Sequence, residues 1–156
     1  MKNLVIVDDC VGSGQQLRTF WEETTIDDNG SQISIEELCE KYSVKANYLT
    51  LFGYNKSIEQ LSDEFPDLNI CCVRELNDQL RVFSEHSYIW STPEERGKAF
   101  ELFDALAKNA GIPTYGYNNL DFAFVMHKTI PDWSLPIFWK ENSDWKLLVR
   151  RKNSND

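Results

Sequence analysis

Two acidic residues followed by a glycine-rich turn stand near the start of the chain, in the segment Asp8-Asp9-Cys10-Val11-Gly12-Ser13-Gly14. Glycines let a backbone turn tightly and bring its N–H groups close to a ligand. A helix starting near Gln15 would aim its unpaired N–H groups at the same place, which suits a phosphate. Carboxylates at the end of a strand suit sugar hydroxyls, or a Mg²⁺ ion held through water. The spacing therefore predicts a site for a phosphorylated sugar.

Three side chains of this turn add hydrogen-bonding groups. Ser13 supplies a hydroxyl, and Gln15 and Gln16 supply amides. Two other phosphate loops do not fit, because a Walker A loop requires a lysine after its second glycine and a dinucleotide fingerprint requires a third glycine. The remaining alternative is an ordinary strand-to-helix turn, since glycine and aspartate both favour turns for local reasons.

The elements that would position this segment alternate between strands and helices. Apolar and β-branched runs predict strands at residues 4–7, 46–52 and 68–73. Apolar spacing and one capping box, formed by Ser34 and Glu37, predict helices at residues 15–23, 34–41 and 57–65. We expect a loop at 8–14, a surface loop at 24–32 and a turn at 53–55. This alternation predicts an α/β fold with a parallel sheet flanked by helices.

The second half of the chain is harder to interpret, except for one helix. Thr92 is the expected N-cap, Pro93 occupies the first helical position, and Glu95 completes a capping box. Gly111 is a natural stop for this helix. Further along we expect a strand at residues 122–126 and extended pieces at 135–139 and 145–149.

Length and composition predict one globular domain over residues 1–156, since 13% of the residues are aromatic. The formal net charge of −9 argues against binding duplex nucleic acid by bulk charge. We therefore expect nucleic acid only indirectly, through a complex. No apolar run approaches the roughly 20 residues of a membrane helix, and the first residues do not resemble a signal peptide, so a cytoplasmic location is expected. The four cysteines lack metal-binding spacing, so we expect reduced thiols and no protein metal site.

The segment from Leu4 to Gln16 resembles the phosphoribosyl pyrophosphate (PRPP) signature of type I phosphoribosyltransferases, in which an apolar strand and two acids precede a phosphate loop. The resemblance implies that Asp8 and Asp9 are the catalytic residues and contact the ribose hydroxyls. It implies a phosphate loop made of Gly12, Ser13, Gly14, Gln15 and Gln16. It also implies Mg²⁺ carried on the pyrophosphate of the substrate.

Later segments make the chain similar to a divergent bacterial phosphoribosyltransferase-like family linked to anti-phage defence, including retron-type systems. They are Phe83-Ser84-Glu85, Gly116-Tyr117, His127 followed by Ile130-Pro131, Leu135-Pro136 and Trp139, and Trp145 through Leu148 to Arg150. The resemblance implies a defence effector, or toxin, that binds PRPP or a ribose-5-phosphate nucleotide and transfers the phosphoribosyl group or cleaves an N-glycosidic bond. The alternative is a non-catalytic nucleotide-sensing or antitoxin-like interaction module of a defence complex.

The chain departs from the family pattern in three places. Gln16 replaces the second threonine of the phosphate loop, and Gly12 stands where some members carry an acidic general base. About a hundred residues precede this strand in the full-length family, so we expect the N-terminal half of the family's sheet to be absent. A second subunit or a second copy of the chain is expected to complete the fold, because an uncovered strand edge favours association. A competing interpretation is that the chain completes a small sheet with its own later strands.

Overall fold

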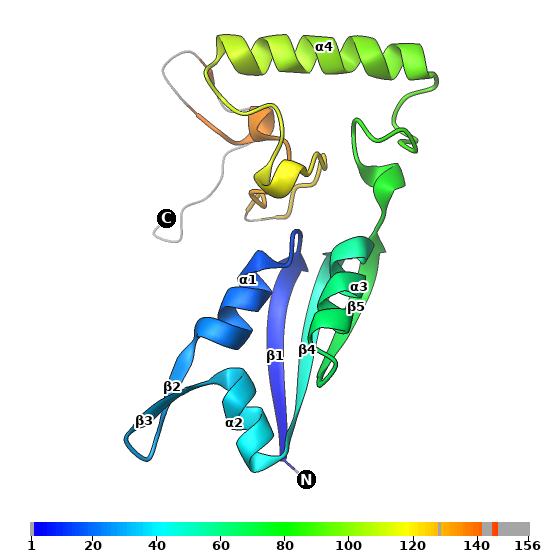
Figure 1. The fold of residues 1–156 in the computed structure, drawn as a ribbon. Helices are drawn as coiled ribbons and strands as arrows, with labels where there is room; N and C mark the ends of the chain where they lie inside the picture. Colours follow the sequence, from blue (N-terminus) through cyan, green and yellow to red (C-terminus); the bar gives the residue numbers. More distant parts are fainter. Residues whose placement is uncertain (1, 128, 142–144, 147–156) are drawn as a thin grey trace. The chain divides into compact units, whose positions relative to one another are not determined.

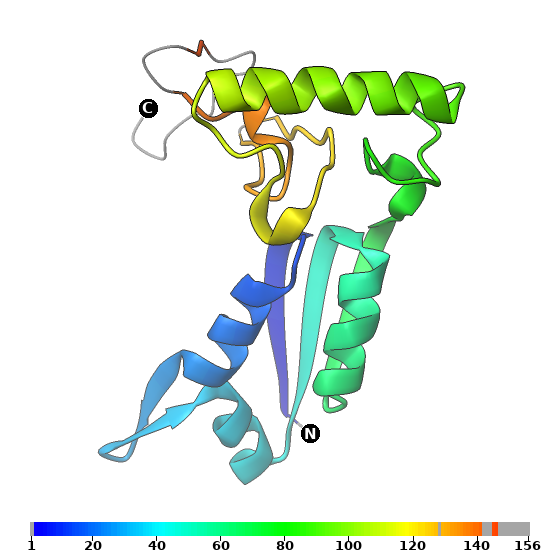
Figure 2. The same cartoon turned by 45° about the horizontal axis from the view of Figure 1, so that its top comes forward.

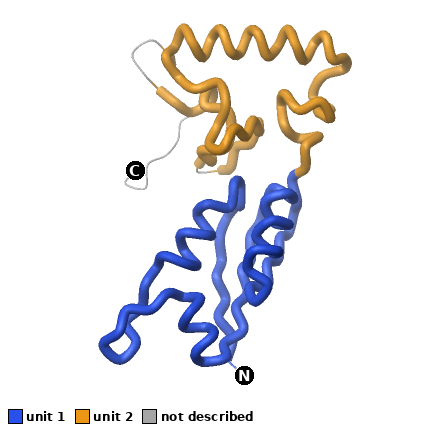
Figure 3. Tube along the Cα trace, viewed as in Figure 1, with its two compact units in different colours: residues 1–76 blue, residues 77–156 orange. Residues whose placement is uncertain are grey.

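A computed structural model describes residues 2–127, 129–141 and 145–146. The chain divides into two compact units, residues 1–76 and 77–156 (Figure 3). The interpretation of residues 1–156 as one domain stays a prediction, and each unit is described here by itself.

The first unit is built on a parallel sheet of three strands in the order β1-β4-β5 (Figure 1, Figure 2). The strands are β1 (Lys2–Val11), β4 (Val44–Tyr54) and β5 (Leu68–Leu76). The helices are α1 (Gln15–Arg18), its π-helical continuation η1 (Thr19–Glu23), α2 (Ile35–Tyr42) and α3 (Asn55–Glu64). Val7 on β1 pairs with Leu49 on β4, which pairs in turn with Cys71 on β5. The predicted α/β fold with a parallel sheet flanked by helices is confirmed.

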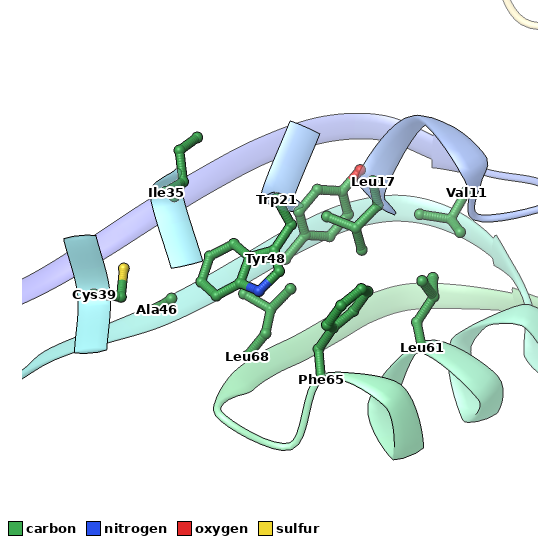
Figure 4. Packing of buried hydrophobic residues seen from close by; sticks show 10 residues of the cluster. All are labelled: Val11, Leu17, Trp21, Ile35, Cys39, Ala46, Tyr48, Leu61, Phe65 and Leu68. Carbon is green, nitrogen blue, oxygen red and sulfur yellow. The ribbon is translucent and has the colours of Figure 1, made fainter. Parts of the chain in front are cut away.

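Side chains along each strand alternate between the two faces of the sheet. One face is covered by helices and the other is open. The helix-covered face packs in a single core with Leu17, Trp21, Ile35 and Leu61 of the helices (Figure 4). The other face keeps large apolar side chains exposed, with Val7 at 77% and Val73 at 79%. Parallel sheets are normally covered on both faces. The sheet of the first unit differs, because its second face carries exposed apolar side chains.

Three segments of the first unit that were expected to be loops or turns, 8–14, 53–55 and 24–32, belong in part to strands. Asp8, Asp9, Cys10 and Val11 extend β1, and the expected turn at 53–55 gives its first two residues to β4. The expected surface loop at 24–32 is a hairpin of β2 (Thr25–Asp28) and β3 (Ser31–Ser34). Its turn is Asn29-Gly30, both with positive φ, 57° and 88°. An Asn-Gly pair adopts this conformation readily, which is why it closes two-residue hairpins.

The capping boxes predicted from sequence are confirmed in one case and altered in the other. At the start of α2, Ser34 Oγ accepts a hydrogen bond from the Glu37 N–H at 3.1 Å, and the Glu37 carboxylate accepts one from the Ser34 N–H at 2.8 Å. At the start of α4 (Pro93–Asn109), Thr92 Oγ1 accepts from the Glu95 N–H at 3.1 Å. The Glu95 carboxylate, however, accepts from the N–H of Ser91. Both helices therefore begin where the sequence places them.

The rest of the second unit is mostly irregular, with α4 packed on a core of its own. It contains short 3₁₀ helices, η2 (Asp78–Leu80), η3 (Tyr117–Asn119) and η4 (Pro136–Phe138). The strand expected at 122–126 is wrong: Phe122 makes only isolated bridges, to Arg81 and Ser134. The extended piece expected at 135–139 is also wrong, because η4 begins at Pro136, whose fixed φ suits a first helical position. Of the piece expected at 145–149, residues 147–149 lie outside the described residues.

No helix within the described part of the chain combines the length and the apolar character that a membrane crossing requires.

Candidate functional site

The glycine-rich turn lies where the sequence places it, between the end of β1 at Val11 and the start of α1 at Gln15. Gly14 has φ 81° and ψ −4°, in the left-handed region. A Cβ atom on Gly14 would lie 2.9 Å from Leu61 Cδ1 and 3.2 Å from Arg18 Nη1. Backbone conformation and space therefore both require glycine here.

Hydrogen bonds inside the turn hold its shape. The Arg18 N–H donates to the Gly14 carbonyl at 3.0 Å, which closes the first helical turn. The Gln15 N–H points back toward Ser13 Oγ, at 3.4 Å. Ser13 is half-buried, while Gln15 and Gln16 are exposed. The turn is thus preorganised by its own backbone, and its glutamine side chains face solvent.

Arg18 lies against the glycine turn, a contact that sequence reasoning missed. Its Nη1 donates to the Ser13 carbonyl at 3.2 Å, and its Nε forms an ion pair with Glu64 Oε2 at 2.8 Å. Glu64 is the last residue of α3, so a second element holds the guanidinium against the turn. The sequence does contain a signal for this contact, because a basic residue stands four positions after Gly14, one helical turn further on.

Asp8 and Asp9 point to opposite faces of β1, as neighbouring residues in a strand must. Asp8 Oδ2 accepts a hydrogen bond from the hydroxyl of Tyr48 on β4, on the helix-covered face, and Asp8 Oδ1 accepts from the Asp9 N–H at 2.8 Å. Asp9 is exposed on the other face. The expectation that both aspartates belong to the loop is wrong, because β1 continues to Val11. Their assignment as ribose-binding catalytic residues stays a prediction.

Tyr48 is the buried partner that sequence reasoning did not associate with Asp8. It is 3% exposed and lies in the core with Leu17 and Trp21. Burial raises the pKa of the Tyr48 hydroxyl far above its usual value, and the hydrogen bond to Asp8 raises it further. Tyr48 therefore stays protonated at neutral pH and acts as a hydrogen-bond donor that fixes Asp8.

The described residues bring together no group of three or more His, Cys, Asp or Glu side chains that could hold a metal ion. A Mg²⁺ ion does not need such a group, because one or two carboxylates together with substrate phosphates are often enough to bind it. The exposed carboxylate of Asp9 fits that limited role. The reduced state expected for the four cysteines stays a prediction. Cys71 and Cys72 point to opposite faces of β5, since Cys71 is exposed and Cys72 is half-buried.

Several residues in the second half of the chain make close packing or hydrogen-bond contacts inside the second unit. A Cβ atom on Gly116 would lie 2.6 Å from the Ser134 carbonyl oxygen, so this glycine allows two backbone segments to approach. Trp133, which is 5% exposed, stacks on Phe124 at 5.2 Å between ring centroids. Asp121, which sequence reasoning missed, is 1% exposed, pairs with Arg81 and accepts from the Phe83 N–H at 2.6 Å. These residues have structural roles within their unit.

Comparison with protein families matches residues 1–151 of this chain to the family PRTase-CE. The comparisons with curated proteins and with solved structures found no match.

Proposed function

Because the chain belongs to PRTase-CE, a phosphoribosyltransferase-like family, we propose that residues 8–16 bind the ribose-5-phosphate part of PRPP or of a related nucleotide. The observation that carries the proposal is the turn itself, which follows the end of a strand in a parallel sheet. Ligands of α/β folds bind at this end of the strands. Gly14 adopts a conformation there that only glycine takes easily, as a backbone cradle for a phosphate requires.

Arg18 supplies the positive charge that this cradle needs. Its guanidinium lies against the turn through the Ser13 carbonyl, and only 22% of the side chain is exposed. A partly buried guanidinium interacts with an anion more strongly than a solvated one does. The ion pair with Glu64 holds the guanidinium in place before a ligand arrives, so little side-chain entropy is lost on binding.

The two aspartates have different tasks in this proposal. Asp9, which is exposed, would accept hydrogen bonds from ribose hydroxyls and would help to hold Mg²⁺ brought in on the pyrophosphate. Asp8, held by Tyr48, lies one residue away and adds negative charge near the sugar. Negative charge beside the ribose stabilises an oxocarbenium-like transition state. When bound, Mg²⁺ neutralises charge on the leaving pyrophosphate.

We further propose that the protein is a cytoplasmic effector of a bacterial defence system, of the toxin or retron-associated kind, and that it works with a second subunit or a second copy of itself. Within the described residues, β1 and β5 each pair only with β4, so their outer edges are available for another strand. The reaction is phosphoribosyl transfer or cleavage of an N-glycosidic bond. The second candidate function is a nucleotide-sensing, antitoxin-like module, favoured by Gly12 at the position where an acidic general base would stand.

Calorimetry of the full chain with PRPP and Mg²⁺, combined with an assay for released pyrophosphate, tests both candidates. Asp9→Asn should abolish pyrophosphate release, and the matched control Asp63→Asn on α3 should leave it unchanged. Binding of PRPP without turnover would support the sensor. Absence of PRPP binding by the wild-type chain would contradict the proposal.

A further inference from the structure

The open face of the sheet in the first unit carries a patch of exposed apolar side chains. Five of them are large aliphatic residues that are 39–79% exposed, and the sixth is an exposed cysteine. This open-face patch consists of Val5, Val7, Leu49, Leu51, Cys71 and Val73. The strand register places Val7, Leu49 and Cys71 side by side on the three strands. A contiguous apolar patch of this kind marks an interaction surface in many soluble proteins.

The polar side chains next to the patch already bind one another. Asn47 pairs with Val5 in the register of β1 and β4, and with Asn69 in the register of β4 and β5. Asn69 Nδ2 donates a hydrogen bond to Asn47 Oδ1 at 3.0 Å. Because this bond stays intact when another surface covers it, covering the asparagine pair leaves fewer polar groups without a partner.

Charges of opposite sign stand at the two ends of the open face. Lys45 is exposed and alternates onto the same face as Leu49, four residues further along β4. Asp9 is exposed on this face near the end of β1. In the register Lys45 pairs with Asn3, which is six residues before Asp9. At about 3.3 Å per residue, the two charges are roughly 20 Å apart along the strands.

We propose that the open face binds the open face of a second copy of this chain, through a two-fold axis that runs across the strands. This axis makes the strands of the two copies antiparallel, so Lys45 of each copy lies opposite the level of Asp9 of the other. Two ion pairs form at once, and Val5 of each copy covers Val7 of the other. A two-fold axis along the strands would instead place Lys45 on Lys45. The charges therefore select one orientation of a self-complementary interface.

The size of the face fits a weak, reversible dimer. The ten residues of β1 are roughly 33 Å long, and three strands are roughly 14 Å wide. Two such faces bury about 900 Å² together, less than the roughly 1,200–2,000 Å² of stable interfaces. We therefore expect the dimer to dissociate at micromolar concentrations. This interface rests on the proposed association with a second copy and places it on a face rather than a strand edge, and PRPP binding plays no part in it.

Sedimentation equilibrium of the full chain without PRPP, over about 1–500 µM, tests the apolar part of the interface. The wild type should show a reversible equilibrium between monomer and dimer. Val7→Lys places a charge in the middle of the patch and should raise the dissociation constant at least about tenfold. Leu102→Lys on α4 is the matched control, because Leu102 is also exposed, at 57%, and lies outside the patch. It should associate like the wild type.

A charge exchange tests the orientation. Lys45→Glu and Asp9→Lys should each weaken the dimer about tenfold, because each variant replaces both ion pairs with pairs of like charge. In an equimolar mixture, dimers of one variant with the other regain both ion pairs and should form with about the dissociation constant of the wild type. Lys98→Glu on α4 makes the same change of net charge as Lys45→Glu and should have no effect.

Three results would overturn the proposal. They are a wild-type chain that stays monomeric over the whole range, equal association of Val7→Lys and Leu102→Lys, and mixed dimers no tighter than those of each charge variant alone. Dimers formed through strand edges would not respond to these substitutions, so they would overturn this interface and leave the proposed PRPP site untouched. The charge variants change exposed side chains, so the mixing experiment stands even if Val7→Lys fails to fold.

Discussion

The hydroxyl of Tyr48 on β4 donates a hydrogen bond to the carboxylate of Asp8 on β1, across two neighbouring parallel strands. Tyr48 is buried in the core, while Asp8 lies three residues before the end of its strand. The contact therefore links the core to the segment that leads into the glycine turn.

Tyr48→Phe should destabilise the first unit, because it keeps the ring in the core but leaves the half-buried Asp8 carboxylate without its tyrosine donor. A hydrogen bond to a charged group is worth about 1.5–3 kcal/mol. We expect the free energy of unfolding in urea to fall by about that amount at pH 7. An unchanged free energy would show that solvent replaces the tyrosine hydroxyl.

The hydrogen bond between Tyr48 and Asp8 also predicts that the free energy of unfolding falls at alkaline pH. Burial and the bond to Asp8 raise the pKa of Tyr48 in the folded state, so the unfolded chain loses this proton first. The stability it contributes is complete below the pKa of an unfolded tyrosine, about 10, and is lost as pH rises toward the folded value. The stability advantage of the wild type over Tyr48→Phe should therefore shrink by about 1 kcal/mol between pH 9 and pH 11. A constant difference, measured by urea unfolding, would contradict this account.

Gly14→Ala should damage both stability and ligand binding. Its φ of 81° is strained for alanine, and the new Cβ would meet Leu61 Cδ1 at 2.9 Å. We expect a loss of about 1–3 kcal/mol in the free energy of unfolding, and loss of PRPP binding. Gly30→Ala is the matched control, since Gly30 has φ 88° with nothing within 4 Å of the added Cβ. It should show only the backbone cost and bind PRPP like the wild type.

Arg18→Gln should weaken PRPP binding about tenfold, because it removes the charge held beside the turn. Arg74→Gln on β5 makes the same change of net charge and should have little effect. Calorimetry with PRPP and Mg²⁺ measures both. Equal losses in the two variants would mean that only bulk charge matters, and would remove Arg18 from the site.

Local signals in the sequence identify much of the fold. The Ser34–Glu37 and Thr92–Pro93 signals act within one helical turn, so they can be recognised without knowledge of distant contacts. The Asn29-Gly30 turn is local as well. An Asn-Gly pair is a hairpin signal, and here it closes the β2–β3 hairpin in a segment expected to be a loop.

Distant contacts decide what the sequence could not indicate. The partner of Asp8 is 40 residues away, and that of Arg18 is 46 residues away. Nothing in the Asp8-Asp9 dipeptide shows that β1 runs on through both residues and separates their side chains. Likewise, the aromatic run at 122–126 favours a strand, but its residues pack in an irregular segment with only isolated bridges.

The turn between β1 and α1 is proposed to bind a sugar phosphate. Its most direct test is a titration of the ¹⁵N-labelled full chain with ribose 5-phosphate, following the backbone amides of Ser13, Gly14 and Gln15. We predict that these three amides show the largest shifts and that the shifts saturate together. The proposal would be contradicted if the resonances of these three amides did not shift while those of other amides did. It would also be contradicted if no amide resonance showed a saturable shift.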